Sequence, residues 1–455
     1  MKKLNFKITK KQQNLGKNLV FFLRTYGCQA NERDSEIIKA ILLKMGFKET
    51  KNFQDEQIDL VILNTCAIRQ NAENKVFGLL EQLKKWKKLN KVNHFGICGC
   101  MSQQETTLNL LKDKINNIDF VIGTNNLIDL PFILENVFKN KKQVFKIDKD
   151  IKFCVENWPN FHENKHKALV NIMYGCNHYC SYCVVPYTRG KIRSREKEDI
   201  LLEIDNLIKD GCKEITLLGQ NVNSYGIDLY NNYDLASLLE DVAKTKISRI
   251  RFATSNPWNF NKKIIDVMAQ YNNIMPYIHL PIQSGDETIL RKMNRTMKIK
   301  DYLALIEYAR QKIPHVTIST DFIVGFPNET CWQFAKTLKL YKKIKFDNAY
   351  TFIYSSRPNT PASKIIDKVS QKTKLKRLAK LNKLTKKYSK WNNNKYINQI
   401  VKVLVDGKSK TNQNVNTGYS HNWKVVNFIG KAKQGEIVNV KITSSSIFSL
   451  NGKQI

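Results

Sequence analysis

The sequence YGCNHYCSYC, at residues 174–183, places three thiols at C-x3-C-x2-C spacing, at Cys176, Cys180 and Cys183. An apolar alternating run just before them predicts a β-strand, so the thiols occupy a loop that leaves the end of a strand. Three cysteines can ligate three irons of a cubane 4Fe-4S cluster, whereas an electron-transfer cluster normally takes four. One iron is then left without a protein ligand, and an open iron can bind a substrate.

The same stretch has a second interpretation, a zinc site in which His178 joins the three cysteines as a Cys3His set. Structural zinc sites of this type usually stand in small domains with paired ligand clusters, so the iron-sulfur interpretation is favoured. We expect His178 to be an exposed or packing residue.

The composition indicates a large globular protein with an anionic partner. A length of 455 residues predicts two to four domains, and 42% hydrophobic with 10% aromatic residues argues against extensive disorder. The net charge of +35 exceeds what solubility requires, which makes nucleic acid the first candidate partner. The alternative is that the Lys-rich composition reflects coding bias alone.

Ten cysteines at irregular spacing, without a secretory signal, predict a reducing, cytoplasmic compartment and no disulfide scaffold. The Lys-rich segment 1–18 predicts a disordered basic tail. The apolar run at 20–23 is too short to cross a membrane, so no membrane association is expected.

A strand, cysteine and helix pattern occurs three times in residues 19–138, which we predict to be one domain. Strands at 19–23, 59–63 and 94–97 end before Cys28, Cys66 and the Cys98-Gly99-Cys100 run, and a helical pattern follows each. This alternation predicts an open parallel α/β sheet, in which the carboxyl ends of the strands share one edge.

We therefore expect Cys28, Cys66 and Cys100 to converge, each at a helix N-terminus that lowers the pKa of its thiol. Buried cysteines are often plain small hydrophobes, but three at one topological position favour a second cluster with three protein ligands. Cys98 is interpreted as a packed thiol. The remaining cysteines have no partners at ligand spacing: Cys154, Cys212 and Cys331.

After a linker at 139–161, residues 162–392 alternate six predicted strands with amphipathic helices, which indicates an incomplete (β/α)6 barrel. The strand-like segments are the opening run before Cys176, EITLLGQN, RIRFATSNP, YIHLPIQSG, TISTDFIVGFP and AYTFIYSSRP. Barrel active sites lie at the carboxyl ends of the strands. The polar residues at those ends are Gln220, Asn221, Ser255, Asn256, Gln283 and Ser284.

The last third begins with a predicted helix at 364–395 that carries an apolar stripe of Leu375, Leu378, Leu381 and Leu384 and a strongly basic polar face. That face either contacts solvent only or meets RNA phosphates. Short alternating strands follow, which predict a small β-barrel over 395–455. Its candidates for base stacking are Tyr419, His421 and Trp423, and the alternative for each is packing in the core.

Several stretches resemble one known family. TYGCQANERDSE, LNTCAIRQNAENKVFG and GICGCMSQQE resemble the three blocks of the methylthiotransferase N-terminal domain, and the cysteine loop, with an aromatic residue before its last Cys, resembles the radical S-adenosylmethionine (SAM) signature. The resemblance continues through YGCNHYCSYCVVPYTRGKIRSR, LLGQNVNSYG, HLPIQSG and DFIVGFPNET, and the last barrel resembles a TRAM domain.

The resemblance implies two 4Fe-4S clusters. The radical-initiating one lies on Cys176, Cys180 and Cys183, with its open iron on SAM, and the auxiliary one lies on Cys28, Cys66 and Cys100. It also implies that the barrel mouth contacts SAM, and we assign these contacts to Tyr182, Gln220, Ser255 and Gln283.

CQANERDSE and CVVPYTRG most resemble the branch of the family that modifies isopentenyl-adenosine beside the tRNA anticodon. The implied reaction replaces the C2 hydrogen of adenine: a radical from SAM abstracts it, the auxiliary cluster supplies sulfur and a second SAM supplies the methyl group. A flavodoxin- or ferredoxin-type electron donor and a monomeric enzyme are also implied. Other branches act on threonylcarbamoyl-adenosine of tRNA or on a ribosomal protein, and a rival of another class is a non-catalytic RNA-binding metalloprotein.

Overall fold

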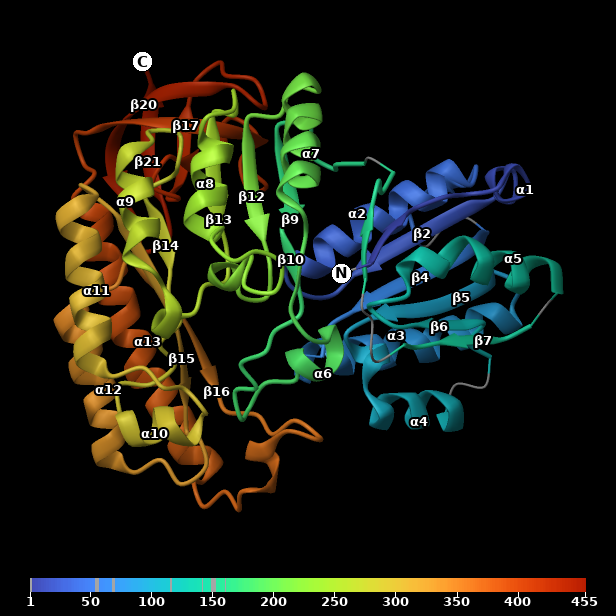
Figure 1. Ribbon diagram of the computed structural model, residues 1–455, viewed down its shortest axis with the longest axis horizontal. Helices are drawn as coiled ribbons and strands as arrows, with labels where there is room; N and C mark the ends of the chain where they lie inside the picture. The colour runs from blue at the N-terminus through green and yellow to red at the C-terminus, as the bar shows by residue number, and fades with distance from the viewer. Residues whose placement is uncertain are drawn as a thin grey trace.

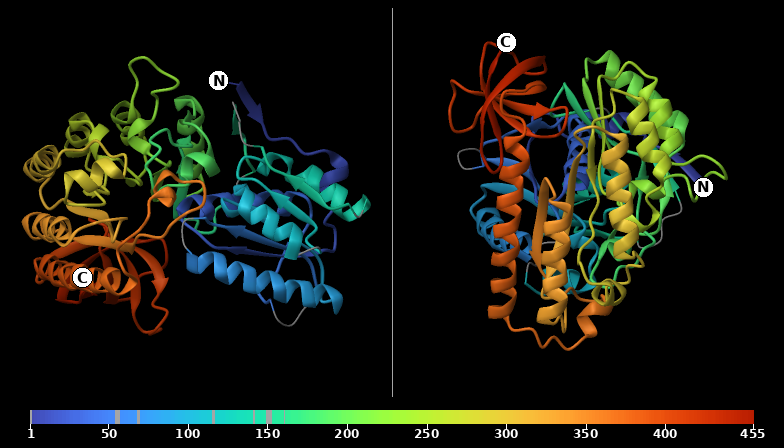
Figure 2. Two further views of the ribbon diagram at one scale, coloured as in Figure 1. Left: turned by 90° about the horizontal axis from the view of Figure 1, so that it is seen from below. Right: turned by 90° about the vertical axis from the view of Figure 1, so that its left-hand side faces the viewer.

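The computed structural model describes residues 2–53, 57–67, 70–114, 117–140, 142–148, 153–159 and 161–455. Three folded bodies follow one another along the chain: a parallel sheet with helices, a six-stranded partial barrel and a small closed β-barrel (Figure 1). The first body lies beside the partial barrel, and the closed barrel sits on one end of it (Figure 2). The predicted fold class is confirmed. Within the described residues, no helix has both the length and the apolar character needed to cross a membrane.

The N-terminal body is a fully parallel sheet with the strand order β3-β2-β4-β5-β6-β7. Alternate residues of its strands pack on opposite sides, so that Leu60 and Ile62 face one core and Val61 and Leu63 face the other. Burial on both faces explains the nearly continuous apolar strands. The strands are β2 Val20–Thr25, β3 Lys48–Glu49, β4 Ile58–Thr65, β5 Val92–Gly99, β6 Phe120–Ile122 and β7 Val144–Lys146. The helices are α2 Gln29–Lys44, α3 Gln70–Lys88, α4 Glu105–Lys114 and α5 Leu130–Asn140.

The predicted disordered tail at 1–18 is wrong for the described residues. Strand β1 (Lys2–Asn5) pairs in parallel with β8 (Phe153–Glu156), and α1 (Lys10–Gln13) begins with a capping box at Thr9. Phe6 and Trp158 stack with their ring centroids 5.4 Å apart. The predicted linker at 139–161 likewise contains two strands, β7 and β8. Local composition could not reveal these pairings because each partner lies far away in the sequence.

The partial barrel has the six predicted strands, hydrogen-bonded as two parallel sheets with the orders β13-β12-β9 and β14-β15-β16. An isolated bridge joins Ile250 of β13 to Ile274, in the segment just before β14. The strands are β9 Lys167–Asn171, β12 Glu214–Leu218, β13 Arg249–Phe252, β14 Tyr277–His279, β15 Thr317–Val324 and β16 Asn348–Ile353. The helices are α6 Val185–Arg189, α7 Lys197–Lys209, α8 Leu235–Ala243, α9 Lys262–Gln270, α10 Glu287–Lys292, α11 Ile299–Lys312, α12 Cys331–Ile344 and α13 Gln371–Asn394.

Alternation along these strands separates the core from the lumen of the barrel. Ile215, Leu217 and Ile250 pack in the main core beneath the helices. Thr216 and Arg251, from the alternate positions, line a cavity of about 460 Å³ that also contacts the N-terminal body. The lumen therefore opens toward the first body.

Helix α13 starts later than the sequence pattern predicted, at Gln371 instead of residue 364. The hydroxyl of Ser370 accepts a hydrogen bond from the backbone N–H of Thr373 at 3.2 Å, which caps the helix start. Leu381 is fully buried, whereas Leu375 is 53% exposed, so the first residue of the predicted apolar stripe lies outside the core.

The C-terminal body is a closed barrel with the order β17-β18-β19-β21-β20. Its strands are β17 Ile400–Lys408, β18 Asn416–Ser420, β19 Val425–Ile429, β20 Ile437–Ser445 and β21 Leu450–Gln454. Strand β18 was not predicted, because its sequence NTGYS has no apolar alternation. Its side chains pack within a barrel that closes only when distant strands meet.

The turn between β18 and β19 packs on the partial barrel, which favours the core-packing alternative for its aromatic residues over base stacking. Tyr419 stacks on Trp423 with 4.2 Å between the ring centroids, and the guanidinium of Arg251 lies 3.7 Å from the centroid of the Trp423 ring. Burial lowers the pKa of His421 to about 4. Trp423 is half-buried between these two contacts, so this turn serves as an interdomain contact.

Candidate functional site

The cysteine loop is closed by backbone pairing at its base. Strand β10 (Met173–Tyr174) runs antiparallel to β11 (Arg193–Ser194), and the Cys176 N–H donates to the carbonyl of Gly190 at 3.0 Å. Gly175 has a φ of 72°, and a Cβ placed there would lie 2.0 Å from the carbonyl oxygen of Lys191. Only glycine fits this position.

The same loop is anchored to the barrel through Ser181 and Arg295. The Ser181 hydroxyl donates to the Lys292 carbonyl at 2.7 Å, and its N–H donates to the Met293 carbonyl at 3.0 Å. The guanidinium of Arg295 lies 3.2 Å from the Tyr182 hydroxyl and 3.7 Å from the Sγ atom of Cys180. This buried cation stabilises negative charge at the loop sulfurs.

Burial raises the pKa of the Cys176 thiol to about 11 and that of Cys183 to about 12. Both thiols are therefore neutral at pH 7 in the metal-free chain, and a metal must displace their protons when it binds. Such coupling between metal and proton is usual for thiolate ligands.

His178 is a packing residue, as predicted. Its Nε2 atom lies 2.7 Å from the Nδ2 atom of Asn221, and its ring meets the Trp258 ring edge-on at 5.0 Å. Burial lowers its pKa. Across the described chain, no three His, Cys, Asp or Glu side chains lie close enough to hold one metal ion. A cubane cluster binds each thiolate at a different iron, so its three thiolates need not meet at a single metal ion.

Buried acceptor oxygens without a hydrogen-bond partner gather at the carboxyl ends of β12, β13 and β14. Within the described residues they are Asn221 Oδ1, Ser255 Oγ, Asn256 Oδ1 and Gln283 Oε1. Unpaired buried oxygens are costly, so they indicate a ligand with hydrogen-bond donors. The ammonium and hydroxyl groups of SAM meet that requirement.

The other polar residues predicted for the site are half-buried or already have a hydrogen-bond partner. Gln220 is half-buried at the end of β12. The Tyr182 hydroxyl already contacts Arg295, and the Ser284 hydroxyl accepts from the Asp286 N–H at 3.2 Å near the start of α10. Ser284 therefore serves the helix start. The SAM contacts at Tyr182, Gln220, Ser255 and Gln283 stay predictions.

The N-terminal cysteines stand at the carboxyl ends of β2, β4 and β5, as the alternating pattern predicted. Cys28 is exposed at the start of α2, whereas Cys66 and Cys100 are buried. The Asn31 amide donates to Asn64 Oδ1 at 3.0 Å, and Asn64 Nδ2 donates to the Asn31 carbonyl at 2.8 Å, which joins the first two cysteine loops. Their role as cluster ligands stays a prediction.

The backbone of the third loop is tied to the second. The Cys100 N–H donates to the Thr65 carbonyl at 2.8 Å, and the Thr65 hydroxyl donates to the Cys98 carbonyl at 2.7 Å. Burial raises the pKa of Cys98, whose Sγ lies 3.8 Å from the Leu63 carbonyl oxygen, as expected of a packed thiol.

The segment that follows the radical-site cysteines contacts the auxiliary cysteines directly. Val184 packs in one apolar cluster with Ala67 and Cys100. The Nε atom of Arg189 donates to the Sγ of Cys100 at 3.3 Å, and its Nη2 atom lies 2.7 Å from Asp34 Oδ2. The two cysteine sets are therefore joined by α6 (Figure 1).

The expected lowering of the Cys100 pKa is wrong. Burial raises it, and the nearby Arg189 guanidinium only partly offsets this. The short 3-10 turn Met101–Gln103 that follows has too few aligned peptides for a strong dipole.

Sequence reasoning missed Arg189 and Arg295 as residues of the site. Arg189 lies six residues after Cys183, in the quoted run CVVPYTRG, so its proximity to the motif was an available signal. Arg295 lies far from the loop in sequence, and only the packing of α10 beneath the loop brings it close.

Three known families match this chain: the radical SAM superfamily over residues 170–341, the uncharacterised protein family UPF0004 over 20–123, and the TRAM domain over 394–455. Among solved structures, the radical SAM methyltransferase TsrM from Kitasatospora setae, with cobalamin and a [4Fe-4S] cluster bound, aligns with a TM-score of 0.54 at 12% identity. The alignment covers 76% of this chain and 77% of that chain. This likeness concerns the fold.

Full-length relatives give closer matches. The tRNA-2-methylthio-N(6)-dimethylallyladenosine synthase of Malacoplasma penetrans is 53% identical over 97% of this chain and 90% of the relative. The synthase of the same name from Bacillus cytotoxicus is 46% identical over 99% of this chain and 89% of the relative. The chain therefore belongs to the tRNA-2-methylthio-N(6)-dimethylallyladenosine synthase family of radical SAM enzymes.

Proposed function

We propose that this protein converts N6-dimethylallyladenosine (isopentenyl-adenosine) of tRNA, at the position 3′ to the anticodon, to its 2-methylthio derivative. The contact between the two cysteine sets carries the proposal: Val184, directly after Cys183, packs on Cys100. A radical source and a sulfur donor that act on the same carbon atom must lie side by side. The relatives named above have this product in their names.

The chain has suitable ligands for two 4Fe-4S clusters. Cys176, Cys180 and Cys183 would hold the radical-initiating cluster. The auxiliary cluster would be held by Cys28, Cys66 and Cys100. When bound, the clusters and SAM supply the one-electron chemistry, the sulfur and the methyl group that an unactivated aromatic C–H bond requires. The unpaired oxygens at the strand ends support SAM as the ligand of the barrel mouth.

The protein's own residues prepare these sites. Arg295 offsets negative charge at the radical-site sulfurs, and Arg189 does the same at Cys100. Burial of Cys66 and Cys100 keeps water from two of the three auxiliary ligands, whereas Cys28 is exposed. Ser181 and Gly175 hold the loop in one shape, so the reactive groups keep their relative positions.

The RNA substrate explains the charge of +35. The target base must leave its stack to reach the barrel mouth, which costs a few kcal/mol and is cheapest in a loop.

The reaction also needs an electron donor, for which a flavodoxin- or ferredoxin-type protein is suitable. We place the enzyme in the cytoplasm, because tRNA and reducing conditions are both present there. We also propose that it acts as a monomer.

Nucleoside mass spectrometry tests the proposal. The chain is expressed in a bacterial strain that lacks its own synthase, and 2-methylthio-N6-dimethylallyladenosine is expected to reappear in the tRNA. Cys176→Ala and Cys66→Ala should each abolish it.

The alternatives give other outcomes of the same experiment. The enzyme would belong to another branch if N6-dimethylallyladenosine stayed without its methylthio group while threonylcarbamoyl-adenosine of tRNA, or a ribosomal protein, became methylthiolated. RNA binding without any product, in a chain that carries zinc, would make it a non-catalytic RNA-binding metalloprotein.

A further inference from the structure

A basic pocket lies at the opposite end of the partial barrel from the cysteine loop. It has a volume of about 360 Å³ and is lined by the ends of α11, α12 and α13. Its lining includes the starts of β15 and β16, near Val316 and Asp347, whereas the cysteine loop follows the carboxyl end of β9. A strand of six residues spans about 20 Å, which sets the scale of the separation.

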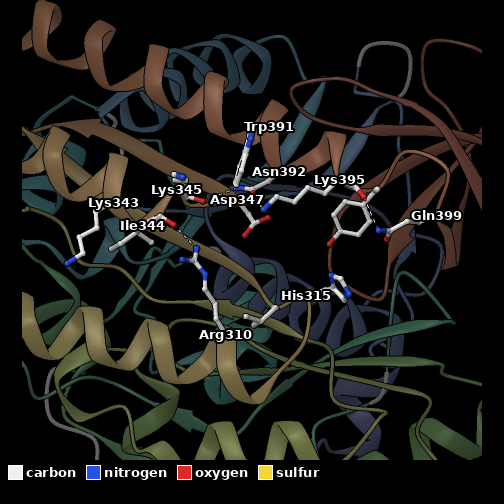
Figure 3. Close-up of a pocket in the computed structure, with 12 residues that line it drawn as sticks. Arg310, His315, Lys343, Ile344, Lys345, Asp347, Trp391, Asn392, Lys395 and Gln399 are labelled. Carbon is white, nitrogen blue, oxygen red and sulfur yellow. Dashed lines mark hydrogen bonds between the residues drawn. The ribbon is translucent and has the colours of Figure 1, made fainter.

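Cations outnumber anions in this pocket (Figure 3). Arg310, Lys345 and Lys395 line it together with Lys343 at its edge, and its one carboxylate is Asp347. Asp347 is already paired with Lys424 at 2.8 Å. Burial lowers the pKa of Lys395, and the neighbouring cations lower it further against the pull of Asp347.

Three helix C-termini meet at the pocket, and each contributes about half a negative charge. Arg310 donates to the carbonyl of Ile344 at 2.6 Å, so one cation is partly used to satisfy the end of α12. After the three helix dipoles and Asp347 are subtracted from the four cations, about 1.5 positive charges remain in excess. Capping alone does not account for the number of cations.

Trp391 gives the pocket an aromatic wall. The residue is 45% exposed, and the ammonium groups of Lys345 and Lys395 lie 5.1 Å and 3.7 Å from the ring centroid. A flat ring beside two cations binds an anion that carries a planar group, as a nucleotide of a polynucleotide does.

The pocket continues onto the basic surface of α13. This helix of 24 residues contains no Asp or Glu. Five of its exposed lysines lie on neighbouring turns and lead toward Trp391: Lys372, Lys376, Lys380, Lys383 and Lys387. At 1.5 Å per residue the helix is about 36 Å long, which exceeds any small metabolite. A continuous basic track of this length fits a nucleic-acid backbone.

From this geometry we infer that Arg310, Lys345 and Lys395 form a phosphate-binding pocket with Trp391 for the tRNA substrate, remote from the modified base. The inference rests on the proposed function. A contact so far from the reacting carbon is made equally in the ground state and the transition state, so it acts on substrate affinity.

The test is a salt titration of tRNA binding by the full chain, measured by fluorescence anisotropy with labelled tRNA that carries N6-dimethylallyladenosine. Lys345→Gln combined with Lys395→Gln should reduce the slope of log K against log salt by about two, since each lost phosphate contact removes about 0.9. The expected KM for tRNA rises at least tenfold, while kcat falls less than twofold. Lys209→Gln, on the exposed end of α7, is the matched control and should change neither value.

A second measurement uses the pocket's own fluorophore. Inorganic phosphate should quench the fluorescence of Trp391. This fluorescence is the difference between the emission of the wild-type chain and that of Trp391→Phe. The quenching should vanish in the double lysine variant. If the double lysine variant keeps the wild-type salt slope and the enzyme is active, the pocket does not bind tRNA phosphates, and the proposed function still holds. A reduced slope in a chain that modifies no tRNA would uphold the pocket and overturn the function.

Discussion

The Nε atom of Arg189 lies 3.3 Å from the Sγ atom of Cys100. The same guanidinium contacts Asp34, so a single side chain connects the segment after the radical-site cysteines to Cys100 and to α2. Hydrogen bonds to cluster sulfurs tune iron-sulfur centres, and this one is already formed in the metal-free chain.

Replacing Arg189 with Lys should weaken the auxiliary cluster selectively. Lysine keeps the charge but cannot bridge Cys100 and Asp34 with a planar fork. After anaerobic reconstitution, iron should fall from about eight to about four per chain, and the remaining electron paramagnetic resonance signal should be that of the radical-site cluster. Arg291→Lys, exposed on α10, is the control. Full iron content with unchanged spectra would show that Arg189 has no role there.

The ion pair between Arg189 and Asp34 should show strong coupling in a double-mutant cycle. Both side chains are less than 10% exposed, so Arg189→Gln alone leaves a buried carboxylate unpaired and should cost about 3 to 5 kcal/mol of unfolding free energy. Adding Asp34→Asn should recover about 1 to 3 kcal/mol. Urea unfolding of the metal-free chain measures both values. Strictly additive losses would mean that the pair does not act as a unit.

Gly175→Ala should prevent assembly of the radical-site cluster only. The added Cβ meets the Lys191 carbonyl at 2.0 Å and forces φ away from 72°, which opens the base of the loop. We expect about four irons per chain and no cleavage of SAM in the presence of dithionite. Gly78→Ala on α3 is the matched control, because a Cβ there meets nothing within 4 Å. Two intact clusters in Gly175→Ala would contradict this geometry.

The contact between the closed barrel and the partial barrel should weaken in acid through His421. Burial, with Arg249 and Lys402 nearby, lowers its pKa from 6.5 to about 4. The unfolded chain therefore binds the proton first, and stability present above pH 6.5 is lost as the pH falls toward 4, by on the order of 2 kcal/mol.

Thermal unfolding at pH 7 and pH 5 measures this effect. The midpoint of His421→Gln should fall less between the two pH values than that of the wild type. His315→Gln, an exposed histidine at the same end of the barrel, should behave as the wild type does. Parallel losses in all three chains would assign the acid sensitivity to other groups.

Much of the fold followed from local patterns. The apolar runs of β4 and β5, the six strands of the partial barrel and the alternating strands of the last barrel were all predicted, because burial imposes a period that is visible in single segments. The errors concern pairings between distant segments. Strand β1 needs β8, and β18 needs a closed barrel, and neither partner can be inferred from composition.

For the site, too, the local features could be predicted from the sequence, and the contacts between distant segments could not. The C-x3-C-x2-C loop could be found at once, and the position of Cys28, Cys66 and Cys100 at strand ends followed from the rule that parallel strands end at one edge. The sequence by itself therefore determined the candidate ligands, the fold class and the charge: two sets of three thiols on an α/β scaffold with an excess of positive charge. Spacing along the chain is enough for that, because ligand type and strand period are local properties.

Only the tertiary structure decided how those parts meet. It placed Val184 and Arg189 against Cys100, brought Arg295 beneath Cys180, and turned Trp423 from a candidate RNA contact into a support for Arg251. The physical reason is that burial and charge pairing depend on which distant segments pack together, and that choice is made by the whole chain when it folds.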